Sequence, residues 1–275
     1  MTSGRPEVHL LSDGNFSLDP GAYFGIVPRP LWEKYFSLDT RGRVLLSLNV
    51  LLVRGEKYSA LVDSGIGRIA NEKLSNIFEV NENRGFVKDI EKYVEPDAID
   101  YILQSHLHFD HSGNSFIKNQ DGEFLFKNAR IVVQKKEMNA FRKPDEFTKG
   151  NYISGNSKVP ASRMLYIEGS KKINSDLRVV ITGGHSRGHQ VIIIGSPGNE
   201  FIYFGDLIPS AFHVKLPYVT AIDIEPLETV RMKKLLIRKA IRDHAICIFN
   251  HDNEMPAAFV SGEPENPKLE AVSLQ

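Results

Sequence analysis

Four side chains that commonly bind metal ions lie close together in the segment His106-Leu-His-Phe-Asp-His111. They are three imidazoles and one carboxylate, from His106, His108, Asp110 and His111. Zinc and similar cations prefer this mixture of nitrogen and oxygen ligands. So dense a cluster would otherwise gather costly polar groups with no structural return. The segment therefore indicates a metal site.

Three further polar residues follow apolar runs much later in the chain. His185 comes after residues 177–181, Asp206 after 200–204 and His251 after 245–249, just as His106 follows 99–103. Each run has the length and composition of a buried strand. Because strand ends at one edge of a sheet converge in space, we expect these side chains to meet near His106.

The apolar patterns predict two similar halves. In the first half we expect a hairpin over 44–53 and 58–62, a helix over 71–94 that Pro96 ends, strands at 101–103 and 129–133, and a helix over 135–141. In the second we expect strands at 177–181, 190–194, 200–204 and 245–249, the last of them the final strand, and a helix over 226–243. Strands followed by helices in both halves predict an α/β fold of two sheets between helical layers.

These motifs, taken together, resemble the metallo-β-lactamase superfamily. The resemblance runs from about Asn49 to Asp252 and rests on the His106–His111 motif, a Gly-His185, Asp206 and His251. It is closest to the two-metal hydrolases, including lactonases and enzymes like methyl parathion hydrolase. It implies the αββα sandwich, with two mixed sheets flanked by helices and the metals at one edge of the sheets.

The resemblance implies a role for each motif position. The first metal would be held by His106, His108 and His185. The second would be held by Asp110, His111 and His251. Asp206 would bridge the two metals, since a carboxylate offers two oxygens. Asp63 and His189 would not bind metal themselves but would support the ligands, Asp63 by orienting one of them.

The implied cofactors are two divalent metal ions, zinc first, with manganese, iron or cobalt as alternatives. Two such ions lower the pKa of a shared water and hold a hydroxide as nucleophile. Asp110 would be the catalytic residue that passes a proton to the leaving group. We therefore expect a metal-dependent hydrolase.

The substrate class is narrowed by what the chain lacks. It has no cysteine at the position of Asp206, as a β-lactamase of this superfamily would, and no long tail after His251 for a thioesterase helical region. We expect hydrolysis of a small ester, foremost a lactone of the acyl-homoserine type. The alternatives are a phosphotriesterase or arylesterase of the organophosphate-hydrolase type, and a metal-binding protein without turnover.

Several residues are candidates for the substrate pocket. We expect His213 to contact substrate and the aromatic side chains of Phe24, Trp32, Phe109 and Phe212 to line an apolar pocket, with core packing as the alternative for each. The N-terminal segment 1–43 is a candidate pocket wall or dimer contact. The irregular segment 142–162 is a candidate lid.

Composition excludes some partners. The 275 residues carry 34 Lys and Arg against 34 Asp and Glu, so no overall charge favours nucleic acid or an anionic membrane. Cys247 is the only cysteine, which excludes an intrachain disulfide. No apolar run approaches the roughly 20 residues of a membrane span, and no signal peptide is visible. We expect one domain over 1–275, a cytoplasmic location, a small-molecule substrate and a homodimer.

Overall fold

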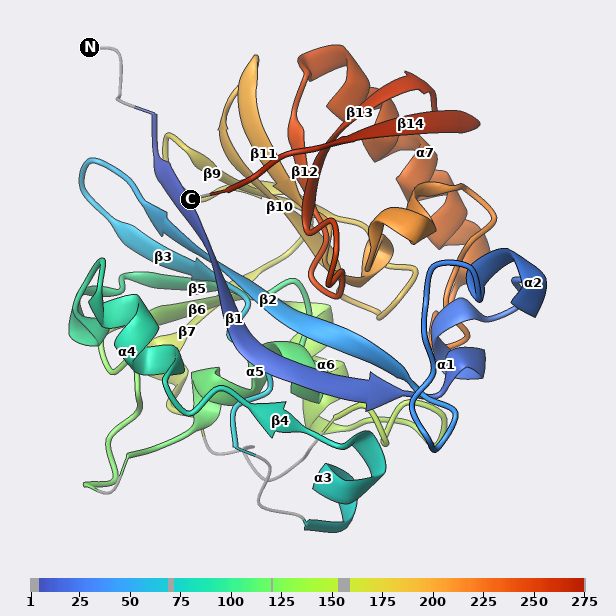
Figure 1. Cartoon of the computed structure of the whole chain (residues 1–275). Helices are drawn as coiled ribbons and strands as arrows, with labels where there is room; N and C mark the ends of the chain where they lie inside the picture. Colours follow the sequence, from blue (N-terminus) through green and yellow to red (C-terminus); the bar gives the residue numbers. More distant parts are fainter. Residues whose placement is uncertain (1–4, 69–71, 120, 153–158, 275) are drawn as a thin grey trace.

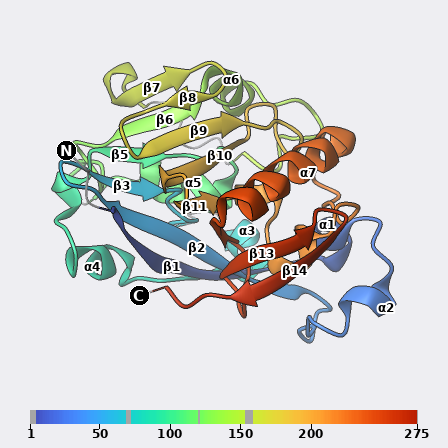
Figure 2. The same cartoon turned by 90° about the horizontal axis from the view of Figure 1, so that it is seen from above.

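The computed structural model describes residues 5–68, 72–119, 121–152 and 159–274 (Figure 1). Within these residues the chain forms two seven-stranded sheets that lie face to face, with helices on their outer sides (Figure 2). This is the αββα sandwich expected from the sequence, and the prediction of fold class is confirmed.

The first sheet comes from the N-terminal half of the chain, in the order β4-β1-β2-β3-β5-β6-β7. Its strands are β1 (Glu7–Leu18), β2 (Val44–Arg54), β3 (Ser59–Val62), β4 (Asn81–Glu82), β5 (Tyr101–Leu103), β6 (Arg130–Gln134) and β7 (Met164–Ile167). Strands β3, β5, β6 and β7 run parallel, while β1, β2 and β3 pair antiparallel. The predicted hairpin of β2 and β3 is confirmed.

The second sheet comes from the C-terminal half, in the order β14-β13-β12-β11-β10-β9-β8. Its strands are β8 (Lys171–Lys172), β9 (Leu177–Ile181), β10 (Gln190–Ser196), β11 (Asn199–Tyr203), β12 (Ile246–Ile248), β13 (Ala257–Glu263) and β14 (Asn266–Ala271). Only the β11–β12 pair is parallel. The four predicted strands of this half are confirmed as β9, β10, β11 and β12.

Helices cover both outer faces. They are α1 (Pro20–Phe24), α2 (Arg29–Trp32), α3 (Glu72–Phe78), α4 (Phe86–Glu91), α5 (Phe109–Phe116), α6 (Lys135–Arg142) and α7 (Pro226–Asp243), with short 3-10 turns at Pro96–Ala98, Ala161–Arg163, Gly205–Leu207 and Ala211–Val214. Helix α7 packs on β11 and β13, whereas α4 and α6 pack on β1 and β6. None of the helices in the described ranges is long and apolar enough to cross a bilayer.

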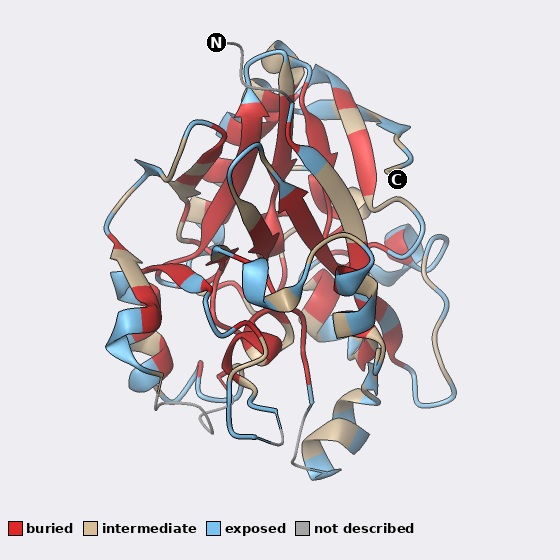
Figure 3. Ribbon diagram, turned by 90° about the vertical axis from the view of Figure 1, so that its left-hand side faces the viewer, coloured by how far each residue is buried: buried red, intermediate tan, exposed pale blue. Residues whose placement is uncertain are grey.

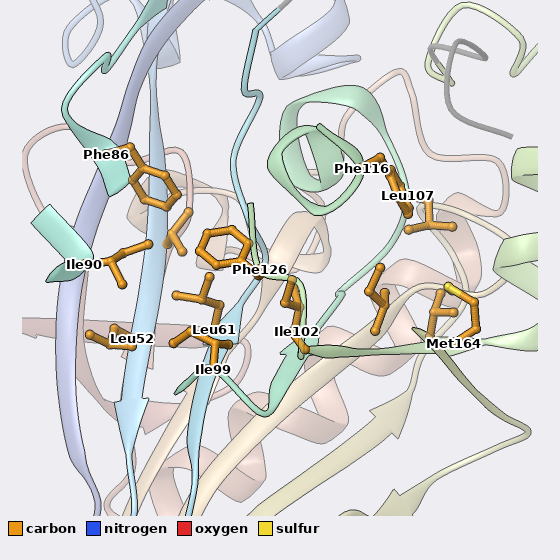
Figure 4. Close-up of a cluster of buried hydrophobic side chains, with 14 of the residues drawn as sticks. Leu52, Leu61, Phe86, Ile90, Ile99, Ile102, Leu107, Phe116, Phe126 and Met164 are labelled. Carbon is orange, nitrogen blue, oxygen red and sulfur yellow. The ribbon is translucent and has the colours of Figure 1, made fainter. Parts of the chain in front are cut away.

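Alternating side chains of the central strands build three apolar layers. In β2, Val50 and Leu52 face the helices of the first half, while Leu51 and Val53 face the second sheet. This is the period of two that a strand imposes, and a strand buried on both faces reads as continuously apolar. Figure 3 shows the buried strands inside and the exposed helix faces outside. Figure 4 shows the layer between the first sheet and its helices.

The prediction of a single helix over 71–94 is wrong. The segment 71–94 contains two shorter helices, α3 and α4, separated by β4, which pairs with β1. The side chain of Asn83 interrupts the helix by donating to the carbonyl of Ser12 at 2.8 Å and accepting from the backbone N–H of Gly85 at 2.9 Å. Asn favours such local bonds over a helix interior.

The structure also adds strands that the sequence patterns do not predict. β12 is not the last strand, because the hairpin of β13 and β14 follows it. Strand β14 lies exposed at the sheet edge, and only residues 257–260 of β13 are buried or partly buried, so neither strand has a long apolar run. In β1 the register shifts between Ser12 and Asn15, which breaks the alternation of apolar residues.

Candidate metal centre

The seven candidate ligands come from loops at one edge of the two sheets. His106, His185, Asp206 and His251 lie within four residues of the ends of β5, β9, β11 and β12 respectively. Asp110 and His111 stand in the first turn of α5. Helix α5 packs closely on the loop after β3, where a Cβ at Gly113 would lie 1.8 Å from the carbonyl oxygen of Ile66. Only glycine permits this approach.

The structure brings these side chains into two groups, each with its ligand atoms within 4.8 Å of one another. The first group is His106, His108, His185 and Asp206, and the second is Asp110, His111 and His251. All are buried except Asp110, which is half-buried. The division matches the one that the family resemblance implies.

The carboxylate of Asp206 lies between the two groups. Its Oδ2 is 3.2 Å from His185 Nε2 and 3.9 Å from His106 Nε2. Its Oδ1 is 3.2 Å from His111 Nε2 and 3.3 Å from His251 Nε2. Two ligands at about 2.0–2.1 Å from a tetrahedral cation would be about 3.3 Å apart. The spacing therefore fits a carboxylate that gives one oxygen to each of two cations.

Hydrogen bonds on the outer side of three imidazoles fix which ring nitrogen is free to bind a metal. The Nδ1–H of His185 donates to Asp223 Oδ1 at 2.8 Å, and that of His251 donates to the carbonyl of Ser47 at 2.8 Å. The Nδ1–H of His111 donates to Asp63 Oδ2 at 2.8 Å. Each Nε2 therefore directs a lone pair into the centre, the arrangement typical of metal-binding histidine.

Asp63 connects two of these ligands. Its carboxylate accepts hydrogen bonds from Ser105 Oγ at 2.7 Å, from the Ser105 backbone N–H at 2.6 Å and from Tyr203 Oη at 3.0 Å. Because Ser105 gives its proton to Asp63, its oxygen accepts from His106 Nδ1 at 3.0 Å. Asp63 has a φ of 57°, an uncommon conformation for a residue with a side chain.

Burial and neighbouring charges favour the metal-binding protonation states of His106, His108 and Asp206. Burial, with nearby histidines, lowers the pKa of His106 well below its ordinary value and that of His108 to about 3, so both imidazoles are neutral. Burial would raise the pKa of Asp206, but the adjacent His111, His251 and His185 lower it well below its usual range. Neutral imidazole and ionised carboxylate are the ligand forms.

Two observations show that the site fits a cation. His106 Nε2 is buried and has no hydrogen-bond partner among the described residues. His185 Nε2 lies 3.1 Å from His108 Nδ1, although the His185 Nδ1–H is already donated to Asp223. Two unshared lone pairs at this distance repel each other unless a cation or a proton lies between them. The chain therefore fits divalent metal ions at this centre.

A pocket opens beside the centre. Its lining residues are Phe16, Leu18, Tyr23, Leu46, Phe78, His108, Phe109, Asp110, Asn151, Asp206, Pro209, Thr220, Ile222 and His251. Most of its walls are apolar, and among these residues none is Lys or Arg. A neutral, partly apolar substrate suits such a pocket.

Of the predicted substrate contacts, only Phe109 belongs to this lining. Phe24, Trp32 and His213 are buried in the aromatic cluster behind it, and Phe212 packs edge-on against Phe24. His213 is held between Ser210 Oγ at 2.7 Å and the carbonyl of Tyr23 at 3.0 Å. These four rings pack on one another outside the lining of this pocket, so their contact with substrate stays a prediction.

The two candidate segments also reach the site. Segment 1–43 supplies Phe16, Leu18 and Tyr23 to the pocket. In segment 142–162, Asn151 lines the pocket and accepts from the backbone N–H of Phe109 at 3.0 Å. Residues 153–158 of the lid prediction lie outside the described residues.

His189 is buried behind the centre. Its Nδ1 is 2.6 Å from Thr182 Oγ1, and its ring centroid is 5.3 Å from that of His106. Four residues outside the predicted set also belong to the site: Asp223, Ser105, Tyr23 and Glu137. Tertiary packing alone brings Asp223, Tyr23 and Glu137 to the site, so no spacing in the sequence marks them, whereas Ser105 directly precedes His106.

Comparison with known proteins identifies the family. The model of the metallo-beta-lactamase superfamily matches residues 44–244, and the chain belongs to this superfamily. An N-acyl homoserine lactonase of Bacillus thuringiensis is 27% identical over 230 residues, covering 78% of this chain and 85% of the lactonase. The chain is a metal-dependent hydrolase of this class.

Solved structures show the same fold. A probable metal-dependent hydrolase from Staphylococcus aureus has a TM-score of 0.87 and 30% identity, covering 99% of both chains. The dizinc quorum-quenching lactonase AidC, solved with a product, has a TM-score of 0.78 and 18% identity, covering 100% of this chain and 97% of its own.

Replacing Asp223 tests how the ligands are held. In Asp223→Ala, His185 loses the acceptor that orients its ring, and we expect metal affinity to fall by about 10- to 100-fold. Competition with a chromophoric chelator measures this change. Asp121→Ala, at an exposed position, is the control. An affinity equal to that of the wild type in Asp223→Ala would contradict the proposed orientation.

Proposed function

We propose that this protein hydrolyses a small neutral ester, foremost the lactone ring of an N-acyl homoserine lactone, with two zinc ions. The observation that carries the proposal is the pair of ligand groups sharing Asp206 beside a pocket without Lys or Arg. An anionic substrate would find no Lys or Arg among the described lining residues. The similarity to proteins named N-acyl homoserine lactonase supports the lactone.

The reaction adds water to the ester carbonyl carbon and breaks its bond to the ring oxygen, giving a hydroxy acid. When bound, divalent cations lower the pKa of water toward neutrality and stabilise negative charge on a substrate oxygen. The protein must then deliver a proton to the leaving oxygen.

The surroundings of Asp110 support a role in that proton transfer. It lines the pocket, and its Oδ2 is 3.4 Å from His251 Nε2 and 3.6 Å from His111 Nε2. We propose that Asp110 accepts a proton from the attacking water and passes it to the leaving oxygen. The apolar walls at Phe16, Leu46 and Phe78 would hold the acyl group and exclude bulk water.

A panel of substrates tests the proposal on the zinc-loaded protein. It contains an N-acyl homoserine lactone, a simple lactone, an aryl ester, a phosphotriester, a β-lactam and a thioester. We expect the lactones to have the highest kcat/KM. A phosphotriester or aryl ester that exceeds every lactone would instead support the alternative function, which the same neutral pocket suits. Faster β-lactam or thioester cleavage would overturn the proposal.

Tyr23 gives a further prediction. Its hydroxyl is buried in the pocket wall and makes no hydrogen bond within the described residues, while Ser210 beside it donates to His213. Burial raises the pKa of Tyr23 well above its ordinary value, so the hydroxyl stays a donor. We expect Tyr23→Phe to lower kcat by about 10- to 100-fold, because a hydrogen bond to a developing charge contributes about 1.5–3 kcal/mol.

The same substitution leaves the fold intact or more stable, since it removes a buried hydroxyl without a partner. Steady-state kinetics and thermal unfolding are measured together, with Tyr35→Phe, 69% exposed, as the control. An unchanged kcat would show that Tyr23 is only a wall residue.

A further inference from the structure

Glu137 in α6 is a buried carboxylate without a positive partner. It is 0% exposed, and no described lysine or arginine forms an ion pair with it. It accepts four hydrogen bonds instead, from the backbone N–H of Leu107 (3.0 Å), Tyr152 Oη (3.0 Å), Ser186 Oγ (2.7 Å) and the backbone N–H of Gly188 (2.9 Å). Burying a charge is costly unless such donors compensate it.

The two oxygens of Glu137 serve different segments. Oε1 accepts from Leu107, which stands between His106 and His108. Oε2 accepts from Ser186 and from Gly188, which follow His185. One carboxylate therefore ties together two segments that are far apart in sequence and that both carry histidines of the first ligand group.

The backbone of the segment after His185 lies close to that of α6 at Glu137. A Cβ at Gly188 would lie 2.5 Å from the backbone nitrogen of Glu137, so the segment after His185 rests directly on the start of α6. Tyr152 adds a third contact, because its hydroxyl donates to Oε1 and its ring centroid is 5.0 Å from that of His108. The position of Glu137 is thereby fixed relative to both segments.

The two ligand groups differ in how far they depend on the hydrogen bonds of Glu137. The first group takes His106 and His108 from one segment, His185 from the other, and Asp206 from the turn after β11. The second group takes Asp110 and His111 from α5 and His251 from the loop after β12. The segment that follows His185 contributes nothing to the second group.

We propose that Glu137 is a positioning residue that sets the spacing of the first metal group and leaves the second largely unaffected. The inference rests on the proposed two-metal centre. It explains why a carboxylate is buried here, since a bidentate acceptor can hold two N–H groups and two hydroxyls at fixed separation.

The test is the effect of Glu137→Gln on each metal affinity separately. Zinc binding is measured by competition with a chromophoric chelator in two backgrounds, His251→Ala, which disables the second group, and His185→Ala, which disables the first. We expect the glutamine to weaken binding by about 10- to 100-fold in the His251→Ala background. In the His185→Ala background we expect the same substitution to change the zinc affinity by less than about threefold.

Several results would overturn the proposal. Equal loss in both backgrounds would show a general structural role, and so would a lower Tm with both affinities unchanged. If Glu137→Gln does not fold, Ser186→Ala and Tyr152→Phe test the proposal in its place. Each removes one hydrogen-bond donor to Glu137 and keeps its carboxylate. Both should weaken the first group alone by a few-fold, and no change in either would overturn the proposal. Glu146→Gln, at an exposed position, is the control.

This readout is independent of substrate. If the wild type binds two zinc ions but opens no lactone, the proposed substrate fails while the role of Glu137 is still decided by the affinities. If His251→Ala and His185→Ala do not each remove one of two zinc ions, the two-metal centre itself is wrong, and the role of Glu137 falls with it.

Discussion

Asp206→Asn is expected to lower kcat/KM for a lactone by about 10³-fold or more, equivalent to at least about 4 kcal/mol of transition-state stabilisation. Among the described residues, Asp206 is the one side chain whose two oxygens face both ligand groups, with Oδ2 toward His185 and Oδ1 toward His111. An amide of the same shape keeps one oxygen but carries no negative charge. Both metals therefore lose an anionic ligand at once.

Kinetics of the zinc-saturated variant measure this effect, with zinc content determined on the same sample. Asp121→Asn, at an exposed position, should behave as the wild type. Asp206→Asn with activity within about tenfold of the wild type would show that the carboxylate does not bridge the reacting centre, because a lost charge there must cost more than one ordinary hydrogen bond.

Metal removal is expected to cause the largest change in stability. Asp110, Asp206 and five histidines are gathered in one buried place, and Asp206 and Asp110 raise the pKa of His251 to about 9 against the effect of burial. Ions that bind only the folded chain add about 4 kcal/mol at a free concentration 1,000 times Kd. For a chain of this size we therefore expect the Tm of the metal-bound protein to be about 8 °C or more above that of the metal-free protein.

Thermal unfolding with zinc and with a chelator measures this shift. Protons compete with metals for the same nitrogens, so the shift should shrink as the pH falls below about 9, the pKa of His251. Asp206→Asn should show a smaller shift than the wild type at equal zinc concentration. A Tm that does not depend on zinc in the wild type would contradict a metal centre built from these residues.

Much of the fold could be predicted because its central strands are buried on both faces. Strands β2 and β10 read as continuous apolar runs, and polar residues directly after such runs mark the edge of a sheet. His185, Asp206 and His251 could be found in this way. The parallel pairs β3–β5 and β11–β12 then place their ends at the same edge.

The remainder depends on contacts that leave no local pattern. Strand β14 is exposed at the sheet edge, β13 is buried only over residues 257–260, and β1 is interrupted by a bulge at Ser12, so none of them has a long regular apolar pattern. Glu137 lies in a short polar helix, where a glutamate reads as a surface residue. Only tertiary packing buries it, as it does Asp223 beside His185.

The sequence also does not reveal which aromatic residues line the pocket. Phe24 and Trp32 stack on each other with ring centroids 4.5 Å apart, which satisfies them within the core. Tyr23, next in sequence to Phe24, lines the pocket instead. Nothing in the pattern of adjacent aromatic residues separates a wall residue from a core residue, since the difference lies in which side of the cluster each ring faces.

The most direct test of the two-metal lactonase account is a titration of the metal-free protein with zinc, following proton release from an N-acyl homoserine lactone. Ring opening yields one carboxylic acid per turnover, so base consumption reports the rate. We predict activity that reaches its maximum only as the second equivalent of zinc per chain binds. Full activity at one equivalent, or no ring opening by protein that holds two, would contradict the account.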